Sequence, residues 1–239
     1  MKRLVVPCAI ALGLAAIGVG EASALGGANP DEQPCRAQTP AFGSPQPQAA
    51  PETAFNDYAA STPDGWTGAD STYSVELPGG RTLWLFSDTY MGPLDADGTR
   101  PVEAPMINNT FVVQDGDRLD TVHGGDADNP EAIMPPSKDG AWFWSGDGMI
   151  AGANGEPELQ VVYREYEKAG EAGWDFSVSR NVAATFSLDD LSTPVAVEEL
   201  PSQSKTAWGA AIVPTSQSND GYTYVYGVAD DTRDKQMRV

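Results

Sequence analysis

Apolar and polar residues alternate in short runs along most of the chain. From about Phe55 onward, aromatic and β-branched residues are dense, and Gly, Asp, Asn and Pro separate the runs. This pattern is typical of antiparallel strands joined by turns, so it predicts an all-β domain over residues 55–239. Helix is expected only as a turn or two within Tyr163–Ala172, and Ser187–Leu191 is expected to form a surface turn.

The clearest single unit is a hairpin between residues 70 and 88. The alternating segments Asp70–Leu77 and Arg81–Asp88 flank a Pro-Gly-Gly sequence, in which glycine can adopt the left-handed conformation that a three-residue turn requires. In the register that closes this turn, one face is apolar in both strands. The same register places Asp70 directly opposite Asp88.

A degenerate repeat indicates how the strands are organised. Gly80–Asp88, Gly140–Asp147 and Gly221–Asp230 each begin with glycine, continue as an aromatic-rich strand and end with an acidic residue. Repeated sheets around an axis form a β-propeller, whose central channel gathers residues from every blade. The last strand has only just begun when the sequence reaches Val239. We therefore expect a β-propeller that is incomplete in this chain, with its C-terminal part missing.

The N-terminal residues have a different composition. Lys2 and Arg3 precede the apolar run 4–20 and Ala22-Ser23-Ala24, which predicts a signal peptide over residues 1–24. Residues 25–54 are rich in Pro, Gly and Ala, as expected of a flexible linker. We expect a secreted, extracellular protein that has no membrane attachment after cleavage and is a monomer.

Charge and rare residues exclude several classes of function. The chain has 34 acidic and 14 basic residues and a net charge of −20, which repels nucleic acid and anionic membranes. Cys35 is the one cysteine after the predicted signal peptide, so no internal disulfide is expected. His123 is the single histidine, which excludes a zinc site built from several imidazoles. The sequence also lacks a G-x-S-x-G elbow and a P-loop.

The facing aspartates are the leading candidates for catalysis. Two like charges directly opposite each other destabilise a hairpin unless they serve a function. Glycoside hydrolysis uses such a carboxylate pair, and aromatic side chains provide surfaces on which sugar rings stack. Asp70 and Asp88 are therefore candidate catalytic residues; the alternative is that each aspartate caps a turn.

Other side chains are candidates for substrate binding, and each has a structural alternative. The asparagines and Asp147 are also typical of turns, and the tryptophans are also typical of a core. The set comprises Asn108, Asn109, Asp147, Trp84, Trp144 and Trp208. No cofactor or metal is required. Calcium between Asp70 and Asp88, or at the Asp126–Asp128 loop, stays open, although the spacing matches no defined calcium loop.

Several motifs resemble a family of secreted bacterial proteins catalogued as a domain of unknown function. That family is similar to five-bladed β-propeller glycoside hydrolases, and some relatives are endo-D-arabinanases. The resemblance implies that Asp70 and Asp88 are the catalytic carboxylates, with the regions of Asn108 and Asp147 lining the same cleft. The motifs are Trp66–Asp70, Leu83–Thr89, Met106–Thr110, Phe143–Asp147, Trp208–Ala211 and Tyr222–Gly227.

Three classes of function follow. The first is a secreted glycoside hydrolase-like protein that cleaves a cell-wall or extracellular polysaccharide, of arabinan type if it follows the relatives. The second is a non-catalytic carbohydrate-binding propeller that uses the same aspartates to bind sugar hydroxyls. The third is a surface-exposed protein-interaction module, which the acidic surface permits without indicating it.

Overall fold

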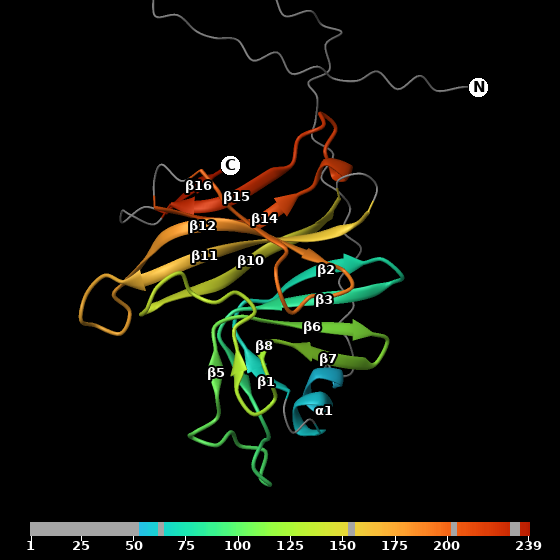
Figure 1. Ribbon diagram of the computed structural model, residues 1–239, viewed down its shortest axis with the longest axis vertical. Helices are drawn as coiled ribbons and strands as arrows, with labels where there is room; N and C mark the ends of the chain where they lie inside the picture. Colours follow the sequence, from blue (N-terminus) through green and yellow to red (C-terminus); the bar gives the residue numbers. More distant parts are fainter. Residues whose placement is uncertain (1–52, 62–64, 153–155, 202–204, 230–234) are drawn as a thin grey trace, which may run out of the picture. The chain divides into compact units, whose positions relative to one another are not determined.

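The computed structural model describes residues 53–61, 65–152, 156–201, 205–229 and 235–239. Within these ranges antiparallel strands predominate, and the one α-helix is α1 (Ala54–Ser61), so the all-β prediction is confirmed (Figure 1). The predicted signal peptide, Cys35 and nearly all of the predicted linker lie outside the described residues. No helix in the described ranges has the length and apolar character needed to cross a membrane.

The first four-stranded sheet contains the predicted hairpin. Its strand order is β2 (Tyr73–Leu77), β3 (Arg81–Phe86), β6 (Thr110–Asp115) and β7 (Arg118–Val122). Strand β2 pairs with β3 in the predicted register, with Tyr73 opposite Leu85 and Leu77 opposite Arg81. The turn glycines Gly79 and Gly80 have φ angles of 86° and 80°, the left-handed conformation that the hairpin was expected to need.

The second four-stranded sheet is a simple meander of β10 (Ala141–Ala151), β11 (Glu158–Lys168), β12 (Phe176–Ser187) and β13 (Ala196–Glu199). A further meander follows, formed by β14 (Thr206–Val213), β15 (Tyr224–Ala229) and β16 (Gln236–Arg238), with the short 3-10 helix η1 (Thr215–Gln217) inside it. The expectation of helix within Tyr163–Ala172 is wrong. Strand β11 continues to Lys168, because it stays paired with long strands on both sides.

A small three-stranded sheet extends the first sheet. It consists of β1 (Trp66–Ala69), β4 (Thr89–Met91) and β5 (Met106–Ile107), in the order β1-β4-β5. Figure 1 shows β1 and β5 below the first sheet, near α1. A two-stranded ladder of β8 (Gly124–Gly125) and β9 (Pro130–Glu131) completes the described strands.

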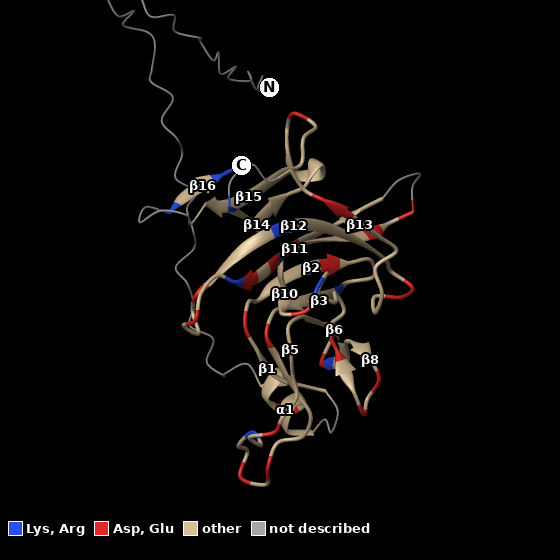
Figure 2. Ribbon diagram, turned by 60° about the vertical axis from the view of Figure 1, so that its left-hand side comes forward, with Lys and Arg blue, Asp and Glu red and all other residues tan. Residues whose placement is uncertain are grey.

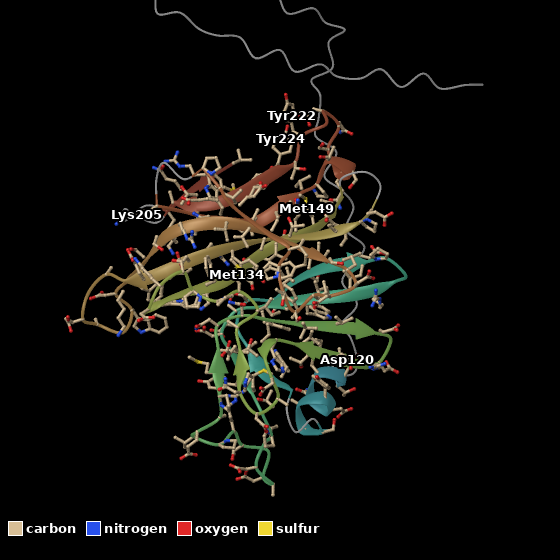
Figure 3. All side chains as sticks on the ribbon, viewed as in Figure 1. Asp120, Met134, Met149, Lys205, Tyr222 and Tyr224 are labelled. Carbon is tan, nitrogen blue, oxygen red and sulfur yellow. The ribbon has the colours of Figure 1, made fainter. Side chains whose placement is uncertain are left out.

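The main hydrophobic core lies between the two four-stranded sheets. Leu83, Leu85 and Phe111 from the first sheet meet Phe143 and Tyr163 from the second, and each is at most 1% exposed. Met134, from the segment before β10, belongs to the same cluster (Figure 3). Burial of these large side chains is the main favourable contribution to folding.

The described sheets do not close into a ring. The meanders β10–β13 and β14–β16 have the strand order of propeller blades, but no closed propeller or barrel is formed by the described residues. The all-β class is therefore established, whereas five blades stay a prediction. Helix α1 was not expected, because all of its residues after Ala54 were assigned to the all-β domain. Its Phe55 packs against Trp66, Trp84 and Phe86.

Candidate functional site

Three polar residues lie side by side at the boundary between the first sheet and the three-stranded sheet β1-β4-β5. The backbone N–H of Asp70 donates to the carbonyl of Asp88 at 2.9 Å, so the hairpin register continues past β2 and β3 into β1 and β4. Strands β3 and β6, and then β4 and β5, share a second continuous register. This register places Asn108 opposite Asp88. Asp70, Asp88 and Asn108 therefore lie side by side on three adjacent strands.

The break between the two sheets is held by buried hydroxyl groups. Ser71, between β1 and β2, has a φ angle of 55°, which turns the chain out of the extended conformation. The hydroxyls of Thr89 and Thr110 lie 2.9 Å apart, and both residues are fully buried. Ser145 of β10 donates to the carbonyl of Phe86 at 2.9 Å. These contacts fix the backbone beside Asp88.

The Asp88 carboxylate is held by two donors. Its Oδ1 atom accepts a hydrogen bond from the Trp144 indole Nε1 at 2.7 Å and another from the Asn108 Nδ2 at 2.9 Å. Because two donors from different segments of the chain bind the same oxygen, the side chain of Asp88 is fixed in orientation. Asp88 is half-buried, whereas Asp70 is exposed.

Asp88 lies between two cavities. One, of about 290 Å³, is lined by Gly68, Ala69, Asp70, Asp88, Tyr90, Arg100 and Met106. The other, of about 360 Å³, is lined by Asp88, Met106, Asn108, Trp142, Trp144, Lys168, Gly173, Trp174 and Phe176. Because Asp88 and Met106 line both, we treat the two cavities as one cleft with Asp88 near its middle, and call it the Asp88 cleft.

One wall of the Asp88 cleft is aromatic. The ring centroids of Trp144 and Tyr166 lie 4.5 Å apart, and those of Trp144 and Phe176 lie 5.2 Å apart. Trp142 lies 5.7 Å from Trp144. Trp174, in the turn between β11 and β12, is 88% exposed and continues this wall outward. An exposed tryptophan beside a carboxylate is suited to stacking on the apolar face of a sugar.

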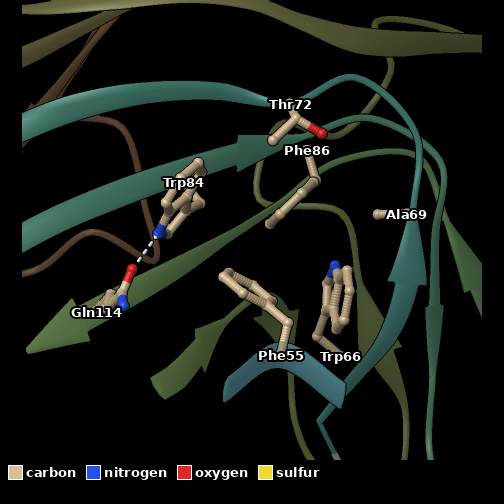
Figure 4. A pocket seen from close by; sticks show the side chains of 7 residues that line it. All are labelled: Phe55, Trp66, Ala69, Thr72, Trp84, Phe86 and Gln114. Atoms are coloured by element: carbon tan, nitrogen blue, oxygen red, sulfur yellow. Dashed lines mark hydrogen bonds between the residues drawn. The ribbon is translucent and has the colours of Figure 1, made fainter. Parts of the chain in front are cut away.

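Two of the predicted site residues lie elsewhere. Trp84 lines a separate cavity of about 380 Å³ beneath α1, where its indole donates to Gln114 at 2.8 Å (Figure 4). Neither Asp70 nor Asp88 lines this cavity. Asn109 is fully buried, and its amide bonds the backbone of Met134 and of Phe143. Asn109 thus connects β6 to the second sheet rather than facing the cleft.

Asp147 and Trp208 also lie outside the two cavities that contain Asp88. Asp147 sits at a bulge in β10, where its Oδ2 accepts from the backbone N–H of Ile212 at 2.7 Å and its Oδ1 from that of Gly148 at 2.9 Å. Burial raises the pKa of Asp147 above its ordinary value and outweighs the opposite effect of these two bonds. Trp208 is at the matching bulge of β14, packed closely over Gly227.

The cleft also contains residues that sequence reasoning did not select. Trp174 stands alone in a glycine-rich turn, and an isolated tryptophan in such a turn is a signal of exposure that was available in the sequence. Phe176 and Trp142 were not selected either, although the aromatic-rich strand that contains Trp142 was predicted. Arg100 comes from a long excursion between β4 and β5, and nothing in its immediate sequence indicates that it returns to Asp70.

The described residues contain no group of three or more His, Cys, Asp or Glu side chains placed to hold a metal ion. Asp126, a candidate for calcium binding, accepts hydrogen bonds from the backbone of Asp128 and Asn129 at 3.1 and 2.9 Å. It therefore caps its own turn. His123 directly precedes β8, and its Nδ1 lies 2.6 Å from the carbonyl oxygen of Gly124.

Comparison with known proteins shows the family to which the chain belongs. A solved structure described as "a putative hydrolase from Bacteroides ovatus ATCC 8483" is similar to the chain with a TM-score of 0.57 and 16% identity. The match covers 72% of this chain and 48% of that one, so the chain spans about half the length of that protein and shares its fold. No curated protein matches. The family model for the domain of unknown function DUF5005 matches residues 52–239, and the chain therefore belongs to that family.

Proposed function

We propose that the protein is a secreted glycoside hydrolase acting on a cell-wall or extracellular polysaccharide, with Asp70 and Asp88 as its carboxylate pair. The observation that carries the proposal is the row of Asp70, Asp88 and Asn108 in a cleft with an aromatic wall. The hydrolase description of the Bacteroides ovatus protein gives independent support. The sheets are then blades of a five-bladed β-propeller, and an arabinan-type glycan is one candidate substrate.

The two carboxylates have different environments, and we assign them different roles. Asp88 is oriented by Trp144 and Asn108, so it acts as the nucleophile or as the base that activates water. Asp70 lines the same cavity as Asp88 and lies opposite it in the register, so we assign it the role of the acid that protonates the leaving oxygen. A carboxyl separation of about 5 Å would give retention of configuration, and one of about 6.5–9.5 Å inversion.

The test measures release of reducing ends from a panel of polysaccharides by the purified protein. Asp88→Asn keeps an oxygen acceptor for Trp144 and Asn108 and should fold normally, but cleavage should fall by at least about 100-fold. Cleavage by the Asp70→Asn variant should fall by a similar factor. Asp120→Asn is the matched control, because Asp120 is exposed on β7, where it pairs with Arg118 (Figure 3). Unchanged cleavage by folded D70N and D88N would dismiss the proposed roles.

A non-catalytic carbohydrate-binding protein is the second candidate. The strongly exposed Trp174 at the edge of the Asp88 cleft favours it, because such a side chain contributes to binding without any part in bond cleavage. Retention of glycan on the protein, with no new reducing ends after long incubation, would support this function over the first.

A further inference from the structure

Cationic side chains are unusually placed in this acidic protein. The whole chain has more than twice as many acidic as basic residues, and Figure 2 shows acidic residues spread over the sheets and the loops. The Asp88 cleft, in contrast, is lined by two acidic and two basic residues. Arg100 lines the half that contains Asp70, and Lys168 lines the aromatic half. One cation therefore lies on each side of Asp88.

Arg100 is held in place by its surroundings. Its Nη2 donates to the carbonyl of Thr67 at 3.0 Å, and its guanidinium lies 4.0 Å from the ring centroid of Tyr90. The absence of a side chain at Gly68 makes room for the Arg100 guanidinium, because a Cβ atom at Gly68 would lie 2.5 Å from the Arg100 Nη2. A guanidinium has five N–H donors, so most remain available after the bond to Thr67. Such a preorganised group binds a carboxylate with little further loss of entropy.

Lys168 is less constrained and complements Arg100. It is the last residue of β11 and is exposed beside Trp174 and Phe176. No ion pair with an acidic side chain is formed by Arg100 or by Lys168 among the described residues. Neither cation is therefore neutralised by Asp70 or Asp88, although they share the cleft. Both residues line the cleft that a ligand would occupy.

We infer that the glycan bound in the Asp88 cleft is an acidic polysaccharide, whose carboxylate groups bind Arg100 on one side of Asp88 and Lys168 on the other. This inference rests on the proposed function, because it takes a glycan to be the ligand. A polymer of uronic acid units carries a carboxylate at regular intervals, so one chain can contact both cations. Without these cations the excess of negative charge would repel such a polymer.

The experiment compares acidic polysaccharides with their carboxyl-reduced forms, which keep the same linkages. The probes are polygalacturonate, alginate and hyaluronate, and binding is measured by affinity electrophoresis at low ionic strength. At least one acidic probe should bind about 30-fold more tightly than its reduced form. Arg100→Gln should weaken that binding about tenfold and Lys168→Gln about threefold, as expected for one charge-assisted contact each. Arg118→Gln removes the same charge away from the cleft and should have no effect.

The outcomes separate this inference from the proposed function. Equal binding of acidic and reduced probes, or equal binding by the R100Q, K168Q and R118Q variants, would overturn the acidic substrate. Cleavage of a neutral glycan that is lost in D88N would also overturn it, and would leave the glycoside hydrolase standing. Binding of an acidic probe that depends on Arg100 and Lys168 but yields no products would support the inference and contradict the enzymatic proposal.

Discussion

Removing the charge of Asp147 should change stability while leaving glycan cleavage intact. Asp147 joins the bulge of β10 to that of β14, where the strands approach so closely that a Cβ at Gly146 would lie 2.8 Å from the carbonyl oxygen of Gly209. Asp147→Ala removes the acceptor at 2.7 Å from the Ile212 N–H. An unpaired, partly buried N–H costs about 1–3 kcal/mol, which is the expected loss in the free energy of unfolding.

Asp147→Asn tests the charge separately from the hydrogen bond. Its one side-chain oxygen can still accept from Ile212, whereas its NH2 group cannot accept from Gly148, so its stability at pH 7 should lie within about 1.5 kcal/mol of the native protein. Because burial raises the pKa of Asp147 in the folded state, the native protein loses stability as the pH rises from the ordinary aspartate pKa to the raised value. The Asn variant should lack this loss, so it gains relative to the native protein between acidic and neutral pH.

The assay is urea unfolding followed by tryptophan fluorescence at pH 3 and pH 7, combined with the reducing-end assay. An Asp147→Ala variant as stable as the native protein would refute the argument from the bulge. A folded Asp147→Asn variant that has lost glycan cleavage would show instead that Asp147 contributes to the cleft, as the sequence motifs implied.

Three further substitutions test other contacts. Asn109→Ala removes three buried hydrogen bonds and should lower the unfolding free energy by about 3 kcal/mol, measured by urea unfolding. Burial opposes ionisation of Glu165, but hydrogen bonds from Ser137 and Arg180 outweigh this effect and lower the pKa of Glu165. The stabilising effect of Glu165 is therefore present above the ordinary glutamate pKa, and it is lost as the pH falls through the lowered value. Glu165→Gln should lower the free energy of unfolding by about 1–3 kcal/mol at pH 7 and by less at pH 3. Trp174→Ala should leave the melting temperature unchanged and weaken glycan binding several-fold.

The hairpin was predictable because its pattern is local. Alternation on both strands and the Pro-Gly-Gly turn define one register, and this register brings Asp70 and Asp88 together. Alternation does not reveal a break in a sheet, however. Trp84 and Asp88 are four residues apart, so they would lie on the same face of an unbroken strand. The chain bends after Phe86, however, and the two side chains line different cavities.

Residues from distant strands were harder to place. The neighbours Asn108 and Asn109 have the same residue type, yet one bonds Asp88 and the other is buried against the second sheet. That difference depends on how β6 packs against β10, which no local pattern encodes. Trp144 was selected as a candidate for substrate binding, and its bond to Asp88 was not foreseen; the link from Asp147 to Ile212 spans two meanders and could not be inferred from spacing.

The excursion between β4 and β5, residues 92–105, has freedom that the rest of the cleft lacks. The row of Asp70, Asp88 and Asn108 is aligned by ladders on both sides of the break, so its geometry is independent of the number of residues in the excursion. Doubling the length of such a loop costs only about 0.6 kcal/mol in closure entropy. The excursion can therefore change in length and sequence, at Arg100 as well, without realigning the carboxylates.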